Sequence, residues 1–170
     1  AAQPAMSAVA SAVVDDKGVI LGTGVLGSFP AIFTADAPSI TLSNVVKAAA
    51  AVTMSVAIAP SVSLLSNSKM IATLSGAGLS VNNGALSFTS PSAGAAGSAS
   101  ISASQVLTVT LTAGTFSGGS AIAFSFLVTN PMAAQGALTG VSCAFTNADA
   151  SLLLTTSSFG FFPSIVDGSL

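Results

Sequence analysis

The sequence predicts an all-β protein, an antiparallel β-sandwich of the Ig-like or Greek-key kind preceded by an N-terminal β-hairpin. Two observations predict this class. Apolar residues alternate with Ser, Thr and Ala in many short runs, which is the period of a half-buried strand. Gly, Pro and Asn then interrupt the chain at roughly the 8–12-residue spacing of short strands joined by turns. The uneven connections favour two facing sheets over a regular small barrel.

The clearest strand pattern lies in two neighbouring runs, residues 106–111 and 122–129. In each run, large apolar residues alternate with Thr, Ser or Ala. Residues 112–120 between them are small and polar, and Asn130-Pro131 ends the second run because proline has no amide hydrogen to donate. We predict that the two runs form one hairpin with a buried face and a hydroxyl-rich face.

The same alternation places the other strands in chain order. Residues 15–18, Asp-Asp-Lys-Gly, predict the turn of an N-terminal hairpin. Asn82-Asn83-Gly84-Ala85 predicts a second tight hairpin, because Asn-Gly favours left-handed turn conformations. Residues 90–99 are rich in Ser, Ala and Gly and are expected to be a loop. The further strands are expected at residues 31–34, 39–43, 52–58, 69–75, 79–81, 86–88, 137–145 and 151–156. We divide the chain into residues 1–37, hairpin and connector, and residues 38–170, the sandwich domain.

The chain carries very little charge. Only 5% of its 170 residues are charged, 51% are hydrophobic, and the formal net charge is −2. Three lysines without an arginine cannot form the basic patch that a nucleic acid requires. The longest apolar run, residues 48–59, is too short for a membrane-spanning helix, so we expect no membrane-embedded segment. Because charges normally keep proteins apart, we expect a homo-oligomer or a polymer of like subunits.

The residue types needed for most catalytic sites are missing. The sequence has no His, Glu, Arg, Tyr or Trp. Without His there is no conventional Ser or Cys triad, and one Cys with no His or Glu cannot form a zinc site. The glycines fall in turns rather than in a phosphate-binding pattern between strand and helix. We therefore predict that the protein is not an enzyme and has no catalytic residues, no metal site and no cofactor.

Cys143 is the only cysteine, so it cannot form a disulfide within the chain. It alternates with small residues along a predicted strand. Free cysteine is among the most buried residue types, which favours a thiol in the core. The alternative is an intermolecular crosslink, which one leftover cysteine in a secreted protein permits.

The N-terminal segment is the best candidate for a contact between subunits. Met6, Ala8, Ala10, Ala12 and Val14 line one side of an extended, uncharged stretch. Such a stretch can complete the edge of a neighbour's sheet through main-chain hydrogen bonds. Local pairing with residues 19–25 competes with this arrangement, because closing so short a turn has a small entropic penalty.

A resemblance to a known group adds to this interpretation. Residues 38–43, the alternating strands 52–58 and 106–111, and residues 124–131 with their Val-Thr-Asn-Pro ending occur in this order. Together they resemble the Ser/Thr/Ala-rich β-sandwich repeats of large extracellular surface and fibre proteins in algae, other protists and some bacteria. The resemblance covers roughly residues 38–162. It implies an extracellular structural or adhesive role and carries over no catalytic residue.

We therefore expect a non-enzymatic structural subunit or repeat module of an extracellular filament, sheath or surface layer. The chain opens with Ala1-Ala2 rather than Met, which fits a mature terminus after signal-peptide removal or a domain cut from a longer precursor. The alternatives are a cell-surface adhesin or carbohydrate-binding module, and a viral capsid or decoration protein. A glycan-binding role ranks second because Tyr and Trp are absent. Ser and Thr make up 43 residues with no N-glycosylation sequon, so O-linked sugars and ordinary strand roles both stay open.

Overall fold

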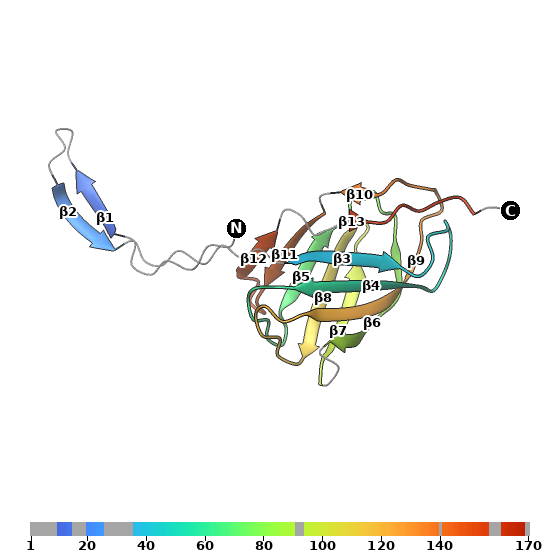
Figure 1. The fold of residues 1–170 in the computed structure, drawn as a ribbon, viewed down its shortest axis with the longest axis horizontal. Coiled ribbons are helices and arrows are strands. Elements are labelled where there is room, and N and C mark those ends of the chain that lie inside the picture. The colour runs from blue at the N-terminus through green and yellow to red at the C-terminus, as the bar shows by residue number, and fades with distance from the viewer. Residues whose placement is uncertain are drawn as a thin grey trace. The chain divides into compact units, whose positions relative to one another are not determined.

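The computed structural model describes residues 10–14, 20–25, 36–90, 94–139, 141–156 and 161–168. Every described strand pairs antiparallel with its neighbours, and no helix occurs among the described residues. No helix in this described part is therefore long and apolar enough to cross a membrane. The predicted all-β class is confirmed (Figure 1).

The described strands are β1 (Ala10–Val14), β2 (Ile20–Val25), β3 (Asp36–Leu42), β4 (Val52–Ala59), β5 (Lys69–Thr73), β6 (Ser80–Ser90), β7 (Ala96–Ile101), β8 (Val106–Ala113), β9 (Ile122–Thr129), β10 (Leu138–Thr139), β11 (Ser142–Thr146), β12 (Leu152–Thr156) and β13 (Phe161–Phe162). The chain divides into two compact units, Ala1–Thr34 and Ala35–Leu170. In the first unit β1 pairs with β2, which is the predicted N-terminal hairpin. The predicted strand at residues 31–34 lies outside the described residues.

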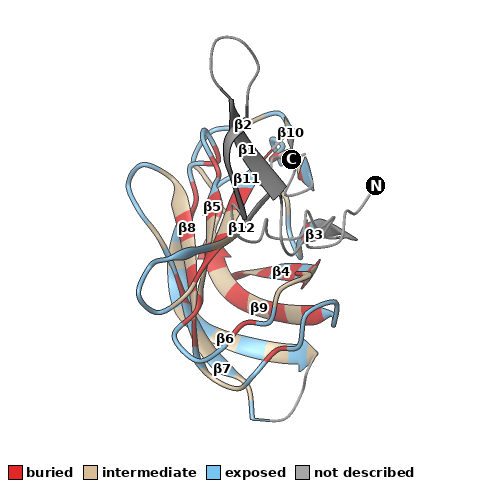
Figure 2. Cartoon of the chain, turned by 90° about the vertical axis from the view of Figure 1, so that its left-hand side faces the viewer, coloured by how far each residue is buried: buried red, intermediate tan, exposed pale blue. Residues whose placement is uncertain are grey.

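The second unit is built on one large sheet. Its described strands follow the order β12-β11-β5-β8-β7-β6-β9-β4-β3, and the sheet curls so that its two halves face each other (Figure 2). We call β3, β4, β9 and β6 the first layer, and β7, β8, β5, β11 and β12 the second layer. The sandwich architecture therefore arises from one continuous curled sheet.

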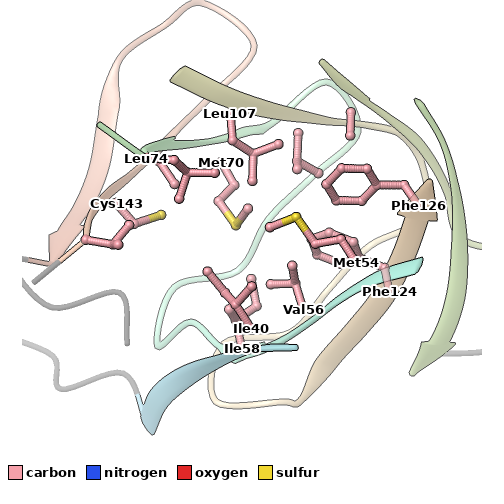
Figure 3. Packing of buried hydrophobic residues seen from close by; sticks show 14 of the residues in the cluster. Ile40, Met54, Val56, Ile58, Met70, Leu74, Leu107, Phe124, Phe126 and Cys143 are labelled. Atoms are coloured by element: carbon pink, nitrogen blue, oxygen red, sulfur yellow. The ribbon is translucent and has the colours of Figure 1, made fainter. Parts of the chain in front are cut away.

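The core lies between the two layers. Along β9 every second residue is buried, and β4 and β8 alternate in the same way, as the sequence pattern predicted. Side chains from both layers meet in the middle, with Met54 and Phe124 from the first and Met70 and Leu107 from the second (Figure 3). Apolar residues of both layers also enclose a void of only about 10 Å³. Packing this tight explains why the alternation is so regular.

The predicted hairpin of residues 106–129 is wrong in its pairing. Both runs are strands, but β8 pairs with β5 and β7, whereas β9 pairs with β4 and β6. The connection between them crosses from one layer to the other. Phe116 anchors this crossing, because it is 2% exposed and its backbone pairs with Leu64. Its ring centroid lies 5.7 Å from that of Phe88.

The predicted turn at residues 82–85 is also wrong, because these residues lie inside β6. Gly84 does not have a positive φ there. The glycine is instead needed for close packing, since a Cβ at Gly84 would lie 2.1 Å from the carbonyl oxygen of Ala99. The register of β6 against β9 shifts on both sides of Asn83, where the sheet bends toward β7.

Two further predictions change in detail. The predicted loop at residues 90–99 contains most of β7, whose small residues let the sheet close around the bend. Gly97 would clash with the backbone of Thr110 if it carried a Cβ. The predicted strand at residues 137–145 is divided into β10 and β11.

The C-terminal residues 161–167 form a strap across one end of the large sheet. β13 pairs with β10, and Gln135 and Ile165 exchange two main-chain hydrogen bonds of 2.9 Å. Val166 forms a parallel bridge with Val46, in the segment that follows β3. Phe162 and Ile165 are 0% and 1% exposed, so the strap is part of the packed domain.

Candidate functional site

Ionisable side chains are scattered over the described part of the chain. No three of its Asp or Cys residues come close enough to hold a metal ion. Lys47 Nζ lies 2.6 Å from Asp167 Oδ1, which ties the C-terminal strap to the segment after β3. Hydrogen bonds from the hydroxyl and the amide of Ser151 lower the pKa of the exposed Asp149, whose Oδ1 accepts from the Ser151 amide at 2.9 Å. Both interactions order a segment of the fold.

Cys143 lies on β11 and points into the core, where Figure 3 shows it near Leu74. The residue is 3% exposed. Burial away from water raises the pKa of its thiol from 9.0 to about 12, because the thiolate would lose its hydration. This placement favours the core-thiol interpretation over a crosslink, which would require the sulfur at the surface.

The proposed N-terminal contact segment is only partly described. Met6 and Ala8 lie outside the described residues. Ala10, Ala12 and Val14 belong to β1, and their Cα partners are Val25, Thr23 and Ile20 of β2. In this structure the segment therefore forms the local hairpin that competes with pairing to a neighbour.

Within the part of the chain that the structure describes, the large sheet ends at β12 on one side, so β12 is an edge strand of the second layer. Among the described strands, β11 is the one neighbour of β12. The strand has the sequence Leu-Leu-Leu-Thr-Thr, with no charge and no proline. Leu152, its first residue, is 62% exposed. In an antiparallel strand about half of the amides and carbonyls point away from the partner, and no described strand pairs with these groups of β12.

The other end of the large sheet is β3, in the first layer. Its sequence, Asp-Ala-Pro-Ser-Ile-Thr-Leu, contains a charge and a proline near its start. The pairing with β4 shifts register between Asp36 and Ser39, and β13 of the C-terminal strap lies against β3. Charge, proline and irregular register are features that protect a sheet edge from pairing with another chain.

The first layer also carries a shallow groove on its outer face. The groove has a volume of about 230 Å³ and is lined by the hydroxyl residues Ser39, Thr41, Ser55, Thr89 and Ser125. Thr41 is opposite Ser55, and Ser55 is opposite Ser125, so three hydroxyls form a row across three strands. Thr89 donates its hydroxyl hydrogen to the carbonyl of Ala123. Val56, Ala57, Ala123 and Phe124 also line the groove, so it offers a ligand both neutral hydroxyl groups and apolar surface.

Sequence reasoning predicted the strand at residues 151–156 but not its role as a free edge. The alternation pattern gives no information about which strand lies last in a sheet. The run Leu152–Leu154 indicates a strand with little solvated surface on either face, but it does not indicate an edge. The chain matches no protein-family model and no curated protein sequence.

Proposed function

We propose that the chain is a non-enzymatic structural subunit or repeat module that assembles with copies of itself into an extracellular filament, sheath or surface layer. The observation that carries the proposal is the β12 edge, an uncharged strand with β11 as its one described neighbour and with a largely exposed first residue, Leu152. Such an edge is a template for another strand unless the protein blocks it.

The composition of the surface supports the same proposal. Ser98 and Ser100 on β7 are exposed, and Thr108 and Thr110 on β8 are partly exposed. These short hydroxyl side chains carry no charge that would repel a second copy. The extracellular location is part of the proposal and rests on the resemblance of residues 38–162 to surface and fibre repeats.

Light scattering and electron microscopy of the purified chain test this function. We expect particles larger than a monomer whose size grows with protein concentration. A chain that stays monomeric at high concentration would contradict the proposal.

A second candidate, a cell-surface adhesin, is favoured by the hydroxyl-lined groove of the first layer. Hydroxyls can donate and accept hydrogen bonds, which suits a neutral carbohydrate. A glycan array probed with the chain and with its Ser55→Val/Ser125→Val variant tests this candidate. The adhesin function requires a glycan signal that the variant loses, in a protein that remains monomeric.

A further inference from the structure

We propose that β12 accepts the β1–β2 hairpin of a second copy of this chain, with β2 paired antiparallel to β12. The inference rests on the proposed assembly function and names the two strands that meet. It also extends the sequence-based hypothesis, which identified an N-terminal donor but no acceptor.

The hairpin is a suitable donor because, among the described residues of its unit, no third strand pairs with it. β1 and β2 pair with each other over residues 10–14 and 20–25, in a unit that is compact on its own. An isolated two-stranded hairpin is at best marginally stable in water. Pairing with a further strand satisfies the outward main-chain groups of one of its edges.

β12 is a better acceptor than β3. Its five residues match the six of β2 in length, and neither strand contains a charge or a proline. At β3, by contrast, Pro38 removes one main-chain donor, and β13 of the C-terminal strap lies against the strand. A strand that pairs with β12 therefore finds a main-chain donor at every residue, which β3 does not offer.

The charges at the strand ends select β2, rather than β1, as the strand next to β12. Residues 15–18, between β1 and β2, carry a net charge of −1, and Asp149 precedes β12. If β1 paired antiparallel with β12, the end of β1 would lie at the start of β12 and bring these like charges together, which is unfavourable. With β2, about five residues of strand separate them, or roughly 17 Å at 3.4 Å per residue, well beyond the Debye length of about 8 Å.

The arrangement has a consequence for symmetry. The donor surface and the acceptor surface are different, so the contact is heterologous, and a bound pair still has one free donor on one copy and one free acceptor on the other. Unless the rotation closes a ring, such a contact produces an open filament. Residues 26–35 link the hairpin to β3, and ten residues can span at most about 35 Å, which limits the separation of neighbouring subunits.

Two altered proteins, one without the donor hairpin and one with a blocked acceptor edge, test the proposal. The first is the fragment 35–170, which lacks the donor but retains all of the buried core residues that the structure describes. The second is Leu152→Lys in the full chain, which places a charge on the acceptor edge. We expect each protein alone to be monomeric by light scattering, and an equimolar mixture to form a discrete heterodimer and nothing longer. Ser39→Lys, at an exposed position on β3, is the matched control and should assemble like the unaltered chain.

A peptide of residues 10–25 gives a second measurement that does not depend on full-length variants. We expect it to bind the fragment 35–170 and to lose that binding when the fragment carries Leu152→Lys. If the fragment 35–170 dimerises by itself, β12 pairs with β12 of a second copy, and this result would overturn the proposal. Assembly that persists without residues 1–34 overturns the proposal and leaves the assembly function standing, whereas a monomeric unaltered chain overturns the assembly function itself.

Discussion

The two ends of the large sheet differ in how they meet solvent. β3 begins with a charge and a proline, its register is broken, and the C-terminal strap lies against it. β12 contains neither a charge nor a proline, although its pairing with β11 also shifts register, and its first residue, Leu152, is 62% exposed. Since both strands have the same backbone chemistry, the difference lies in the side chains and in the neighbouring segments. Protection of a sheet edge thus depends on the side chains of the strand and on the segments packed against it, and in the described part of the chain both are found at the β3 end.

The largest effect on stability is expected at the bend of the large sheet between β6 and β7. Gly84→Ala would place a Cβ 2.1 Å from the Ala99 carbonyl oxygen, and this contact is with backbone that cannot move aside easily. We expect a loss of more than about 4 kcal/mol in the free energy of unfolding, measured by urea denaturation. Gly136→Ala is the matched control, because a Cβ there meets nothing within 4 Å. Equal stabilities of the two variants would show that the bend tolerates a side chain.

The next effect concerns the core directly behind the β12 edge. Cys143 pairs with Thr156 of β12, and its thiol pKa is raised from 9.0 to about 12. Below pH 9 the thiol is protonated in both states, so stability is unaffected. Between pH 9 and about 12 the unfolded chain loses this proton while the folded chain keeps it, so the free energy of unfolding falls with rising pH. The total loss approaches about 4 kcal/mol, at about 1.4 kcal/mol per pH unit.

Urea denaturation at intervals from pH 8 to pH 11 measures this slope. The control is Cys143→Ala, which keeps all three lysines and should lose the thiol's part of the pH dependence. If the free energy of unfolding falls equally with pH in the two proteins, water reaches the thiol of Cys143 and hydrates the core behind β12. The two ends of the sheet would then differ in the hydration of the core behind them as well as in their edges.

The strands could be predicted from the sequence because the side-chain period is a local property. In β9 and β4 the predicted buried positions are the observed ones, and the predicted burial of Cys143 agrees with its 3% exposure. Pairing is not local. The runs that form β8 and β9 are adjacent in sequence, yet they lie in different layers. The connection crosses from one layer to the other, and burial of Phe116 stabilises this crossing.

The other differences between the predicted and the observed structure lie at small residues. Gly84 and Gly97 suggest a turn and a loop, but both are required where backbones approach closely at the bend. Only the position of Ala99 and Thr110 in space reveals that need, and no sequence pattern encodes it. The candidate edge at β12 was missed for the same reason, because the last place in the sheet order depends on every other pairing.

On the β3 side, one buried amide is expected to have an intermediate effect. Asn130 is 2% exposed, and its Nδ2 donates to the carbonyls of Asn44 at 3.0 Å and Val46 at 2.8 Å. Asn130→Ala removes both donors and should reduce the free energy of unfolding by about 1–3 kcal/mol. The exposed Asn82 is the control, and its replacement by Ala should change stability by about 0.5 kcal/mol or less. If Asn130→Ala leaves the free energy of unfolding unchanged, the strap, rather than the two hydrogen bonds of Asn130, fixes the segment after β3.

The smallest effect is expected from the ion pair that joins the strap to the same segment. Lys47 and Asp167 lie 2.6 Å apart, but their side chains are 44% and 70% exposed, so water and salt weaken their attraction. A double-mutant cycle with Lys47→Ala and Asp167→Ala should give a coupling energy of about 0.2–1 kcal/mol at low salt that fades in 1 M NaCl. The strap keeps its main-chain bridge between Val46 and Val166 in every variant, so the position of the strap should not change. A coupling that stays above about 1 kcal/mol in high salt would show that the strap depends on this charge pair, and that β3 is protected electrostatically as well as by its backbone.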